Sequence, residues 1–298
     1  MNTKEVAEYL DINEKQVYAL IKSKKIPCTK ATGKWLFPKE LIDRWILGDS
    51  ARELTAGKSV EIDKYNSFLA SGSNDPVLEV LLNYMKKSHP GLNIFSSSTG
   101  STEGLRLLKE GLIDIAWCHL FDPQSGRYNI PFISSSFGDM DVTVVHLFYR
   151  ELGFVYTGGL EISSFDDLSK KGVVIVNRQK GSGTRMLLDY NLERAGIPGN
   201  SITGYQNEVY THFEVGLSLA SGEATAGIAT KAIANVFSLG FHPIVIESFD
   251  MVLKQPTFFK KCVQAFIETL NSPEFREKVK SLGNYDFRES GKIIYPES

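Results

Sequence analysis

The sequence of 298 residues lacks the features that mark secreted, membrane-spanning or zinc-dependent proteins. No stretch reaches the roughly 18 uncharged apolar residues that a membrane-spanning helix needs. The N-terminus, Met-Asn-Thr-Lys-Glu, has no apolar export segment, so we expect a cytoplasmic protein with no membrane partner. Cys28, Cys118 and Cys262 are scattered without Cys-x-x-Cys spacing, which favours small buried side chains over a disulfide or zinc framework.

The familiar motifs of catalysis are also missing. The chain has no Gly-x-Ser-x-Gly elbow, no Ser-x-x-Lys pair and no Gly-x-x-x-x-Gly-Lys phosphate loop. Its histidines are dispersed, and none lies three or four residues from another, as helical zinc ligands would. Most are expected to be structural, but His119 and His212 lie at the edges of predicted loops. We therefore expect no enzyme activity, no metal and no cofactor.

Net charge divides the chain into a basic and an acidic part. Residues 1–58 hold 11 Lys and Arg against 8 Asp and Glu, so of the chain's 33 and 35 the remaining residues hold 22 and 27. A basic segment joined to an acidic one suits a small nucleic-acid reader fused to a domain with another role. Leu47 to Lys64 shows little periodicity, so we predict three segments: a domain at 1–48, a linker at 49–64 and a second domain at 65–298.

Two short helices are predicted at the N-terminus. Asn2 with Glu5, and Asn13 with Gln16, have the spacing of capping pairs, which start helices at about residues 3–10 and 14–24. The tight break between them makes a helix-turn-helix candidate. A hairpin over residues 26–37, with its turn at 31–33, and a helix after it are predicted next. The side chains that we expect to contact DNA are Asn13, Glu14, Lys15, Gln16, Tyr18, Lys22, Lys30 and Lys34.

The order Thr3–Leu10, Gln16–Ile21, Lys25–Pro27 and Trp35–Pro38 resembles the excisionase and MerR-like winged helix-turn-helix. The resemblance implies that the second helix enters the major groove of double-stranded DNA while the hairpin acts as a wing. Because the net charge of +3 is modest, one copy should bind weakly, and a homodimer reading two half-sites is expected. A small protein-binding helical module is the alternative.

A strand, a Ser/Gly-rich loop and a helix occur three times in the larger domain. The loops are residues 71–76, 96–102 and 181–185, and the third follows the β-branched run Val173–Val176. In a parallel sheet such loops lie at the carboxyl ends of the strands, where ligands of open α/β domains bind. Helix N-termini offer free backbone N–H groups, and the hydroxyls add further donors. Three such loops in one crevice would hold a small anion.

Residues 65–290 are similar to the type II periplasmic-binding-protein fold, and more closely to the cytoplasmic PBP-like sensory domain that often follows a helix-turn-helix. The run Arg-Gln-Lys-Gly-Ser-Gly-Thr-Arg at residues 178–185 is its most specific part. The other residues that carry it are Ser71–Pro76, Thr99–Ser101, Gly111–Asp114, His119, Leu120, Tyr128, Asn129, Asn177, Thr211, His212, Ser221, Gly222 and Ala226–Ile228.

This second resemblance implies a two-lobed α/β domain that closes on its ligand. Lobe I would comprise about 65–150 and 250–298, and lobe II about 155–245. Molybdate or tungstate is the usual ligand class of the relatives. Arg185 and His212 depart from a charge-free molybdate pocket, so an organic anion such as a pterin phosphate or a carboxylate stays open.

Together these features predict a one-component transcription regulator that senses a small oxyanion. An enzyme or cofactor-handling protein of molybdenum-cofactor metabolism is the alternative, and a binding module whose first domain contacts protein is a third. The residues predicted to bind the ligand are Ser71, Gly72, Ser73, Ser98, Thr99, Gly100, Ser101, His119, Gly181, Ser182, Gly183, Thr184, Arg185, Tyr210, Thr211 and His212.

Overall fold

The computed structural model describes residues 1–23, 25–30, 33–43, 45–46, 66–138 and 140–296. The chain forms two compact units, Met1–Glu61 and Ile62–Ser298, which we call unit 1 and unit 2. The predicted linker, residues 49–64, lies outside the described residues.

Unit 1 contains the two predicted helices, α1 (Thr3–Tyr9) and α2 (Glu14–Lys22). Each begins with a complete capping box, formed by Asn2 with Glu5 and by Asn13 with Gln16, so the capping predictions are confirmed. Thr29 and Leu36 exchange backbone hydrogen bonds of 2.9 and 2.8 Å, which forms the predicted hairpin, although turn residues 31 and 32 lie outside the described part. A small core holds these pieces together, and its buried members are Val6, Ala7, Val17, Ile26, Phe37 and Ile42.

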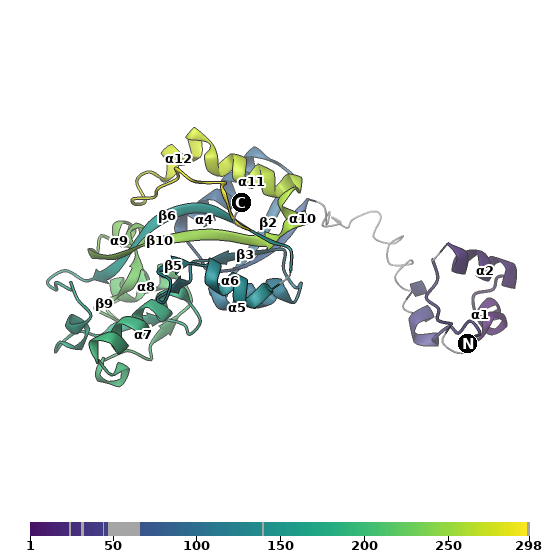
Figure 1. Ribbon diagram of the computed structural model, residues 1–298, viewed down its shortest axis with the longest axis horizontal. Helices are drawn as coiled ribbons and strands as arrows, with labels where there is room; N and C mark the ends of the chain where they lie inside the picture. Colours follow the sequence, from purple (N-terminus) through teal and green to yellow (C-terminus); the bar gives the residue numbers. More distant parts are fainter. Residues whose placement is uncertain (24, 31–32, 44, 47–65, 139, 297–298) are drawn as a thin grey trace. The chain divides into compact units, whose positions relative to one another are not determined.

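Unit 2 is built on a mixed sheet in the order β2-β1-β3-β10-β6-β9-β7-β8, with β11 paired to β6 (Figure 1). Its strands are β1 (Ser67–Gly72), β2 (Asn93–Ser98), β3 (Ile115–Cys118), β6 (Val142–Tyr156), β7 (Ile175–Arg178), β8 (Glu208–Val209), β9 (Ala226–Thr230), β10 (Gly240–Lys254) and β11 (Ile293–Tyr295). A separate small pair consists of β4 (Phe121–Asp122) and β5 (Arg127–Tyr128).

Two long antiparallel strands, β6 and β10, join the lobes of unit 2. At one end β10 pairs with β3 in lobe I, and at the other end β6 pairs with β9 in lobe II. In the sequence the polar residues Arg150 and Glu151 separate two apolar runs, 142–148 and 153–156, which by themselves suggest two shorter strands. The structure shows one continuous strand instead, since Arg150 lies opposite Glu247 of β10 and each satisfies the charge of the other.

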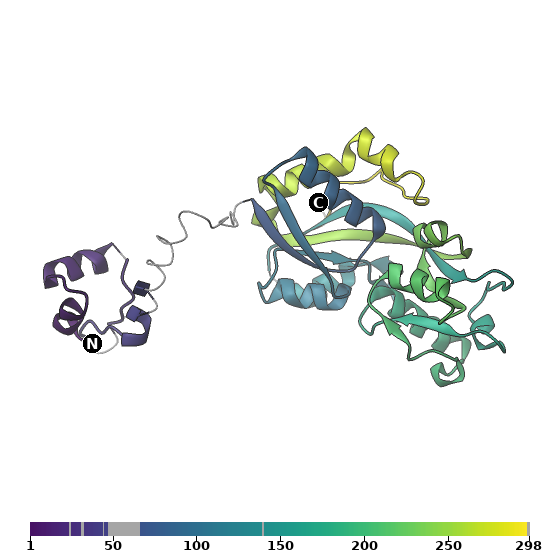
Figure 2. The same ribbon diagram turned by 180° about the vertical axis from the view of Figure 1, so that it is seen from behind.

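Helices cover both faces of the sheet in each lobe. In lobe I, α4 packs beside α11 and α12 on one face, around Leu81, Trp117 and Phe266, while α5 and α6 cover the other face (Figures 1 and 2). In lobe II, α7 packs against one side, and α8 and α9 against the other. The helices are α4 (Pro76–Ser88), α5 (Ser101–Lys109), α6 (Ile130–Phe137), α7 (Gly183–Ala195), α8 (His212–Ala220), α9 (Lys231–Phe237), α10 (Gln255–Phe258), α11 (Lys261–Asn271) and α12 (Pro273–Val279).

Three local expectations were wrong. Residues 96–98, predicted as loop, complete strand β2, because each pairs with a residue of β1 despite its polar side chain. The amphipathic run that begins at Pro256 suggests one helix, but the structure divides it into α10 and α11. Helices α6 and α12 were not predicted, since their apolar patterns are short and flanked by polar residues.

Candidate functional site

The Ser/Gly-rich segments of the sequence meet where the two lobes face each other. Within lobe I, the Gly72 carbonyl at the end of β1 accepts hydrogen bonds from the backbone N–H groups of Thr99 and Gly100, both at 2.9 Å. Across the lobes, the backbone N–H of Thr102 donates to the Gly181 carbonyl at 3.4 Å. The loops after β1, β2 and β7 therefore lie together at the carboxyl ends of their strands, where the sequence pattern placed them.

Further contacts join lobe I and lobe II near these loops. Arg178, at the end of β7, donates from Nη2 to Asn74 Oδ1 of lobe I at 3.3 Å. Gly183 lies against His119, and a Cβ atom at residue 183 would approach the His119 carbonyl to 2.5 Å. The rings of His119 and His212 have centroids 6.4 Å apart. We call the place formed by these segments of lobes I and II the interlobe site.

Five side chains of the interlobe site are almost fully buried and have polar atoms without a hydrogen-bond partner among the described residues. Such atoms are uncommon in native proteins, because a buried unmet donor or acceptor costs about 1–3 kcal/mol. Several of them in one place make it the candidate ligand site of unit 2. We call these residues the interlobe polar cluster; the atoms are Ser73 Oγ, His119 Nε2, Arg178 Nη1, Gln179 Nε2 and both ring nitrogens of His212.

Arg178 brings a positive charge into the interlobe site. Its side chain is 1% exposed, and it donates to the neutral oxygens of Asn74 and Tyr210, the latter at 2.8 Å. Within the described part of the chain it forms no ion pair with a carboxylate. Burial, followed by repulsion from Arg150, lowers the pKa of Arg178 to about 9. A buried guanidinium in this setting suits a bound anion, which would supply the missing negative partner.

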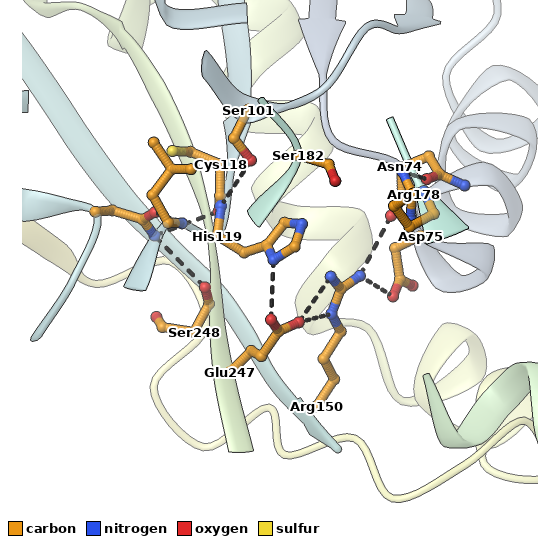
Figure 3. Close-up of polar contacts among 12 residues, drawn as sticks. Asn74, Asp75, Ser101, Cys118, His119, Arg150, Arg178, Ser182, Glu247 and Ser248 are labelled. Carbon is orange, nitrogen blue, oxygen red and sulfur yellow. Dashed lines mark hydrogen bonds and ion pairs between the residues drawn. The ribbon is translucent and has the colours of Figure 1, made fainter. Parts of the chain in front are cut away.

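A charged network lies directly beside this cluster (Figure 3). Arg150 Nη2 lies 2.9 Å from Glu247 Oε2, and its Nη1 lies 2.7 Å from Asp75 Oδ2 at the N-cap of α4. His119 Nδ1 lies 3.0 Å from Glu247 Oε1. Burial would raise the pKa of Glu247, but His119 and Arg150 outweigh it and lower the pKa to about 2. The strands that join the lobes are thus linked, through ionised groups, to a histidine of the interlobe site.

Several predicted hydroxyls hold the loops in place. Ser71 Oγ lies 2.8 Å from Thr99 Oγ1, which joins two of the loops. Ser101 Oγ accepts from the backbone N–H of His119 at 3.2 Å. Ser182 is the N-cap of α7, where its Oγ accepts from the N–H of Arg185 at 3.2 Å. Ser73 and Ser98 also line a groove of about 400 Å³ between α4 and β2 on lobe I. Thr211 caps α8 through a capping box with Glu214.

Three further predicted ligand residues have the following surroundings. Arg185 is neutralised inside lobe II, because it donates to Asp189 at 2.9 Å and to Glu208 at 2.8 Å. Thr184 lines a small cavity of about 10 Å³ together with Arg178, and its buried Oγ1 also has no hydrogen-bond partner among the described residues. The Tyr210 side chain is 59% exposed, and it is the carbonyl of this residue that contacts Arg178.

The sequence interpretation missed the residues that carry the charge of the site. Arg178 and Gln179 were quoted only as part of a motif, although a charged residue at the end of a buried apolar strand is itself a signal of function. No comparable signal marks Arg150 and Glu247, since their pairing depends on the register of two strands that are distant in sequence.

In unit 1 the predicted DNA-binding side chains lie on the surface. Glu14, Lys15, Gln16, Tyr18 and Lys22 are exposed along α2, and Asn13 and Gln16 also form its capping box. In the hairpin, Lys30 lies over the Trp35 ring at 5.5 Å, and Lys34 is exposed.

Metal-binding and membrane-spanning features were sought in the same ranges of the chain. Across the described residues, no three His, Cys, Asp or Glu side chains are grouped so that they could hold a metal ion. In those residues no helix is both long and apolar enough to cross a membrane.

Comparisons with known proteins agree with this architecture. YvgK of Bacillus subtilis is 26% identical over 299 residues, covering 97% of this chain and 96% of its own. A phosphate ABC transporter substrate-binding protein with bound phosphate from Clostridium perfringens is similar in structure, with a TM-score of 0.56 and 17% identity over 74% of this chain and 99% of that one. OxyR of Corynebacterium glutamicum has a TM-score of 0.51 and 13% identity over 94% of this chain and 90% of its own.

Two family models also match. The helix-turn-helix domain matches residues 1–50. The model described as "PBP superfamily domain" matches residues 82–271, which is more than half of the chain and includes most of the interlobe site. The chain therefore belongs to the PBP superfamily, with a helix-turn-helix domain ahead of its two-lobed α/β domain.

Proposed function

We propose that this protein is a one-component transcription regulator. Unit 1 binds double-stranded DNA through the exposed face of α2, and unit 2 binds a small oxyanion at the interlobe site. The observation that carries the second part is Arg178, a buried guanidinium bonded to neutral oxygens. The interlobe polar cluster around it supplies further groups for an anion. We propose no catalytic role for either unit.

The first ligands to test are tetrahedral oxyanions. Molybdate and tungstate are proposed on the sequence resemblance, although Arg178 adds a charged fork to a pocket type that was expected to rely on neutral donors. Phosphate joins them because the similar protein of Clostridium perfringens is described with bound phosphate. Within the site, Arg178 and Gln179 donate from lobe II, while Ser73 donates from lobe I, so one anion would be held by both lobes.

Ligand and DNA binding are coupled through lobe closure in this proposal. Contacts such as Thr102 to Gly181 and Arg178 to Asn74 exist only when the lobes are together. An anion held by both lobes binds this arrangement better than an open one, and this difference is what shifts the population. Closure would then change how two copies of unit 1 are presented in a homodimer, so that their spacing fits two half-sites or does not.

A thermal-shift panel tests the ligand proposal. Molybdate, tungstate, sulfate and phosphate are added to the full chain, and a ligand at about 100 times its Kd is expected to add about 2.7 kcal/mol of stability. Absence of any shift with all four anions, at concentrations up to the millimolar range, would count against the proposed function of the interlobe site.

A gel shift with the upstream DNA of the gene tests the DNA proposal. Binding is expected to weaken as salt increases, because contacts to phosphates release counterions. Binding that does not depend on salt would contradict a reader of this type, and a complex of one chain per DNA would contradict the homodimer.

A further inference from the structure

His119 presents one ring nitrogen to a carboxylate and the other to the interlobe site. Its Nδ1 lies 3.0 Å from Glu247 Oε1, and Glu247 is kept ionised by Arg150 as well. Since an ionised carboxylate only accepts hydrogen bonds, Nδ1 carries the proton of the neutral ring. Nε2 then has a lone pair, and Figure 3 shows it directed toward the region of Ser182 and Arg178.

The formal charges around this ring leave no positive excess before an anion binds. The two guanidinium groups, Arg150 and Arg178, are balanced by the carboxylates Glu247 and Asp75, and Glu214 adds a further negative charge near Arg178. A dianion would therefore leave at least two excess negative charges in a buried place, which is costly. The charged and titratable groups that face His119 are Glu247 of β10, Arg150 of β6, Arg178 of β7 and His212 of α8.

We infer that the bound oxyanion and His119 share one proton, held between Nε2 and an oxygen of the anion. This inference rests on the proposed function of the interlobe site. Without that proton, the lone pair of Nε2 would face the lone pairs of the anion. With it, Nε2 and the anion form a hydrogen bond and the excess negative charge falls by one. Glu247 accepts the hydrogen bond from Nδ1–H, so that Nε2 is the ring nitrogen available to the ligand.

The source of the proton depends on the ligand. A fully deprotonated oxyanion, such as tungstate or sulfate, takes one proton from solvent, which forms the Nε2–H bond while Nδ1–H stays on Glu247. An oxyanion that still has a hydroxyl group, such as hydrogen phosphate, brings the proton with it. His119 therefore determines how the affinity for each class of anion depends on pH.

His119 is able to take up this proton. Burial, opposed by Glu247 and assisted by Arg150 and Arg178, lowers the pKa of His119, so the ring is neutral at pH 7. One proton taken up on binding makes the Kd for tungstate or sulfate rise about tenfold for each pH unit above that pKa. For phosphate we expect a change of less than about twofold between about pH 7 and pH 8.

Calorimetric titration of the full chain tests the inference. Tungstate, sulfate and phosphate are titrated at about pH 7 and about pH 8, in buffers with different ionisation enthalpies, so that both the Kd and the number of protons are measured. His119→Gln keeps an N–H donor near the position of Nε2 and should bind tungstate without a pH slope. His89→Gln, which changes a histidine at the C-cap of α4 outside the interlobe site, is the matched control and should keep the slope.

The outcomes are distinct. If tungstate and sulfate bind the wild type with uptake of about one proton, the inference is supported. Loss of this uptake in His119→Gln would assign the proton to His119. Binding without uptake overturns the inference, even if the variant fails to fold. If only phosphate binds, a gain of sulfate binding in His119→Gln supports the shared proton, and no gain counts against it. No heat with any of the anions overturns the proposed function and this inference together.

Discussion

Replacing Arg178 with glutamine should separate ligand binding from stability. In the ligand-free protein the guanidinium is buried, and its pKa is lowered to about 9 by burial and by Arg150, so the charge is disfavoured where it lies. Glutamine keeps a donor for Asn74 or Tyr210 and removes the charge. The side chain donates three hydrogen bonds, to Gln179, Asn74 and Tyr210, and the loss of two of them, about 2 kcal/mol, is partly offset by the relief of desolvation, so we expect stability to change by at most about 2 kcal/mol.

The effect on the ligand should be much larger. A charge-assisted hydrogen bond contributes about 1.5–3 kcal/mol, which corresponds to a loss of affinity of roughly 10- to 150-fold. Arg178 Nη1 is the atom from which this bond is expected, because it is buried and has no partner among the residues that the structure describes. Titration calorimetry of Arg178→Gln with the best anion of the thermal-shift panel measures this change.

Two other arginines provide controls. Arg150→Gln breaks the ion pairs with Glu247 and Asp75, so it should cost about 3–5 kcal/mol, or roughly 6–20 °C in Tm. Arg185→Gln removes a guanidinium that is neutralised inside lobe II and should leave anion affinity unchanged. The reasoning is refuted if Arg178→Gln destabilises the protein as much as Arg150→Gln does while it binds the anion normally.

Four further predictions follow from individual contacts. Gly183→Ala puts a Cβ 2.5 Å from the His119 carbonyl, so it should prevent closure and abolish the anion-induced thermal shift, while DNA binding in a gel shift persists. Thr184→Val keeps the branched shape and removes only a hydroxyl that lines a cavity of about 10 Å³ beside Arg178, so we expect anion affinity to be retained; a loss of affinity would show that Thr184 contacts the anion. Burial lowers the pKa of His212 and of His119, so both rings stay neutral in the folded protein, whereas in the unfolded chain they are protonated below about pH 6.5. Tm should therefore be highest above about pH 6.5 and decrease as the pH falls below it. An unchanged Tm down to about pH 5.5 would argue against buried neutral rings. Lys15→Ala should weaken DNA binding and reduce the salt slope by about 1, whereas an unchanged slope would place α2 away from the phosphates.

The interlobe site also explains why the long strands are polar at their centre. Arg150 and Glu247 lie opposite each other where β6 and β10 pass from one lobe to the other. They pair with each other, and His119 and Asp75 of lobe I each add one contact to the pair. Removal of a member of this buried network is costly, because it leaves a buried charge without its partner.

The sequence alone determined the local features of this protein. Capping pairs at Asn2 and Asn13 fixed the starts of two helices, because a cap is satisfied by residues three positions apart. The strand and glycine pattern around residues 175–183 likewise placed β7 and the start of α7 correctly to within two residues. The repeated Ser/Gly loops indicated one ligand-binding edge, since the carboxyl ends of parallel strands lie at the same side of a sheet.

Only the tertiary structure decided which charges belong to the site. Arg185 resembled a ligand residue in sequence, yet Asp189 and Glu208 neutralise it. Arg178 did not stand out, yet it is buried and donates to the neutral oxygens of Asn74 and Tyr210 rather than to a carboxylate. This difference depends on which carboxylates the folded chain brings within about 4 Å, a distance at which charges interact strongly in a buried place. The register between β6 and β10 and the approach of the two lobes set those distances, and neither is encoded in any local stretch of residues.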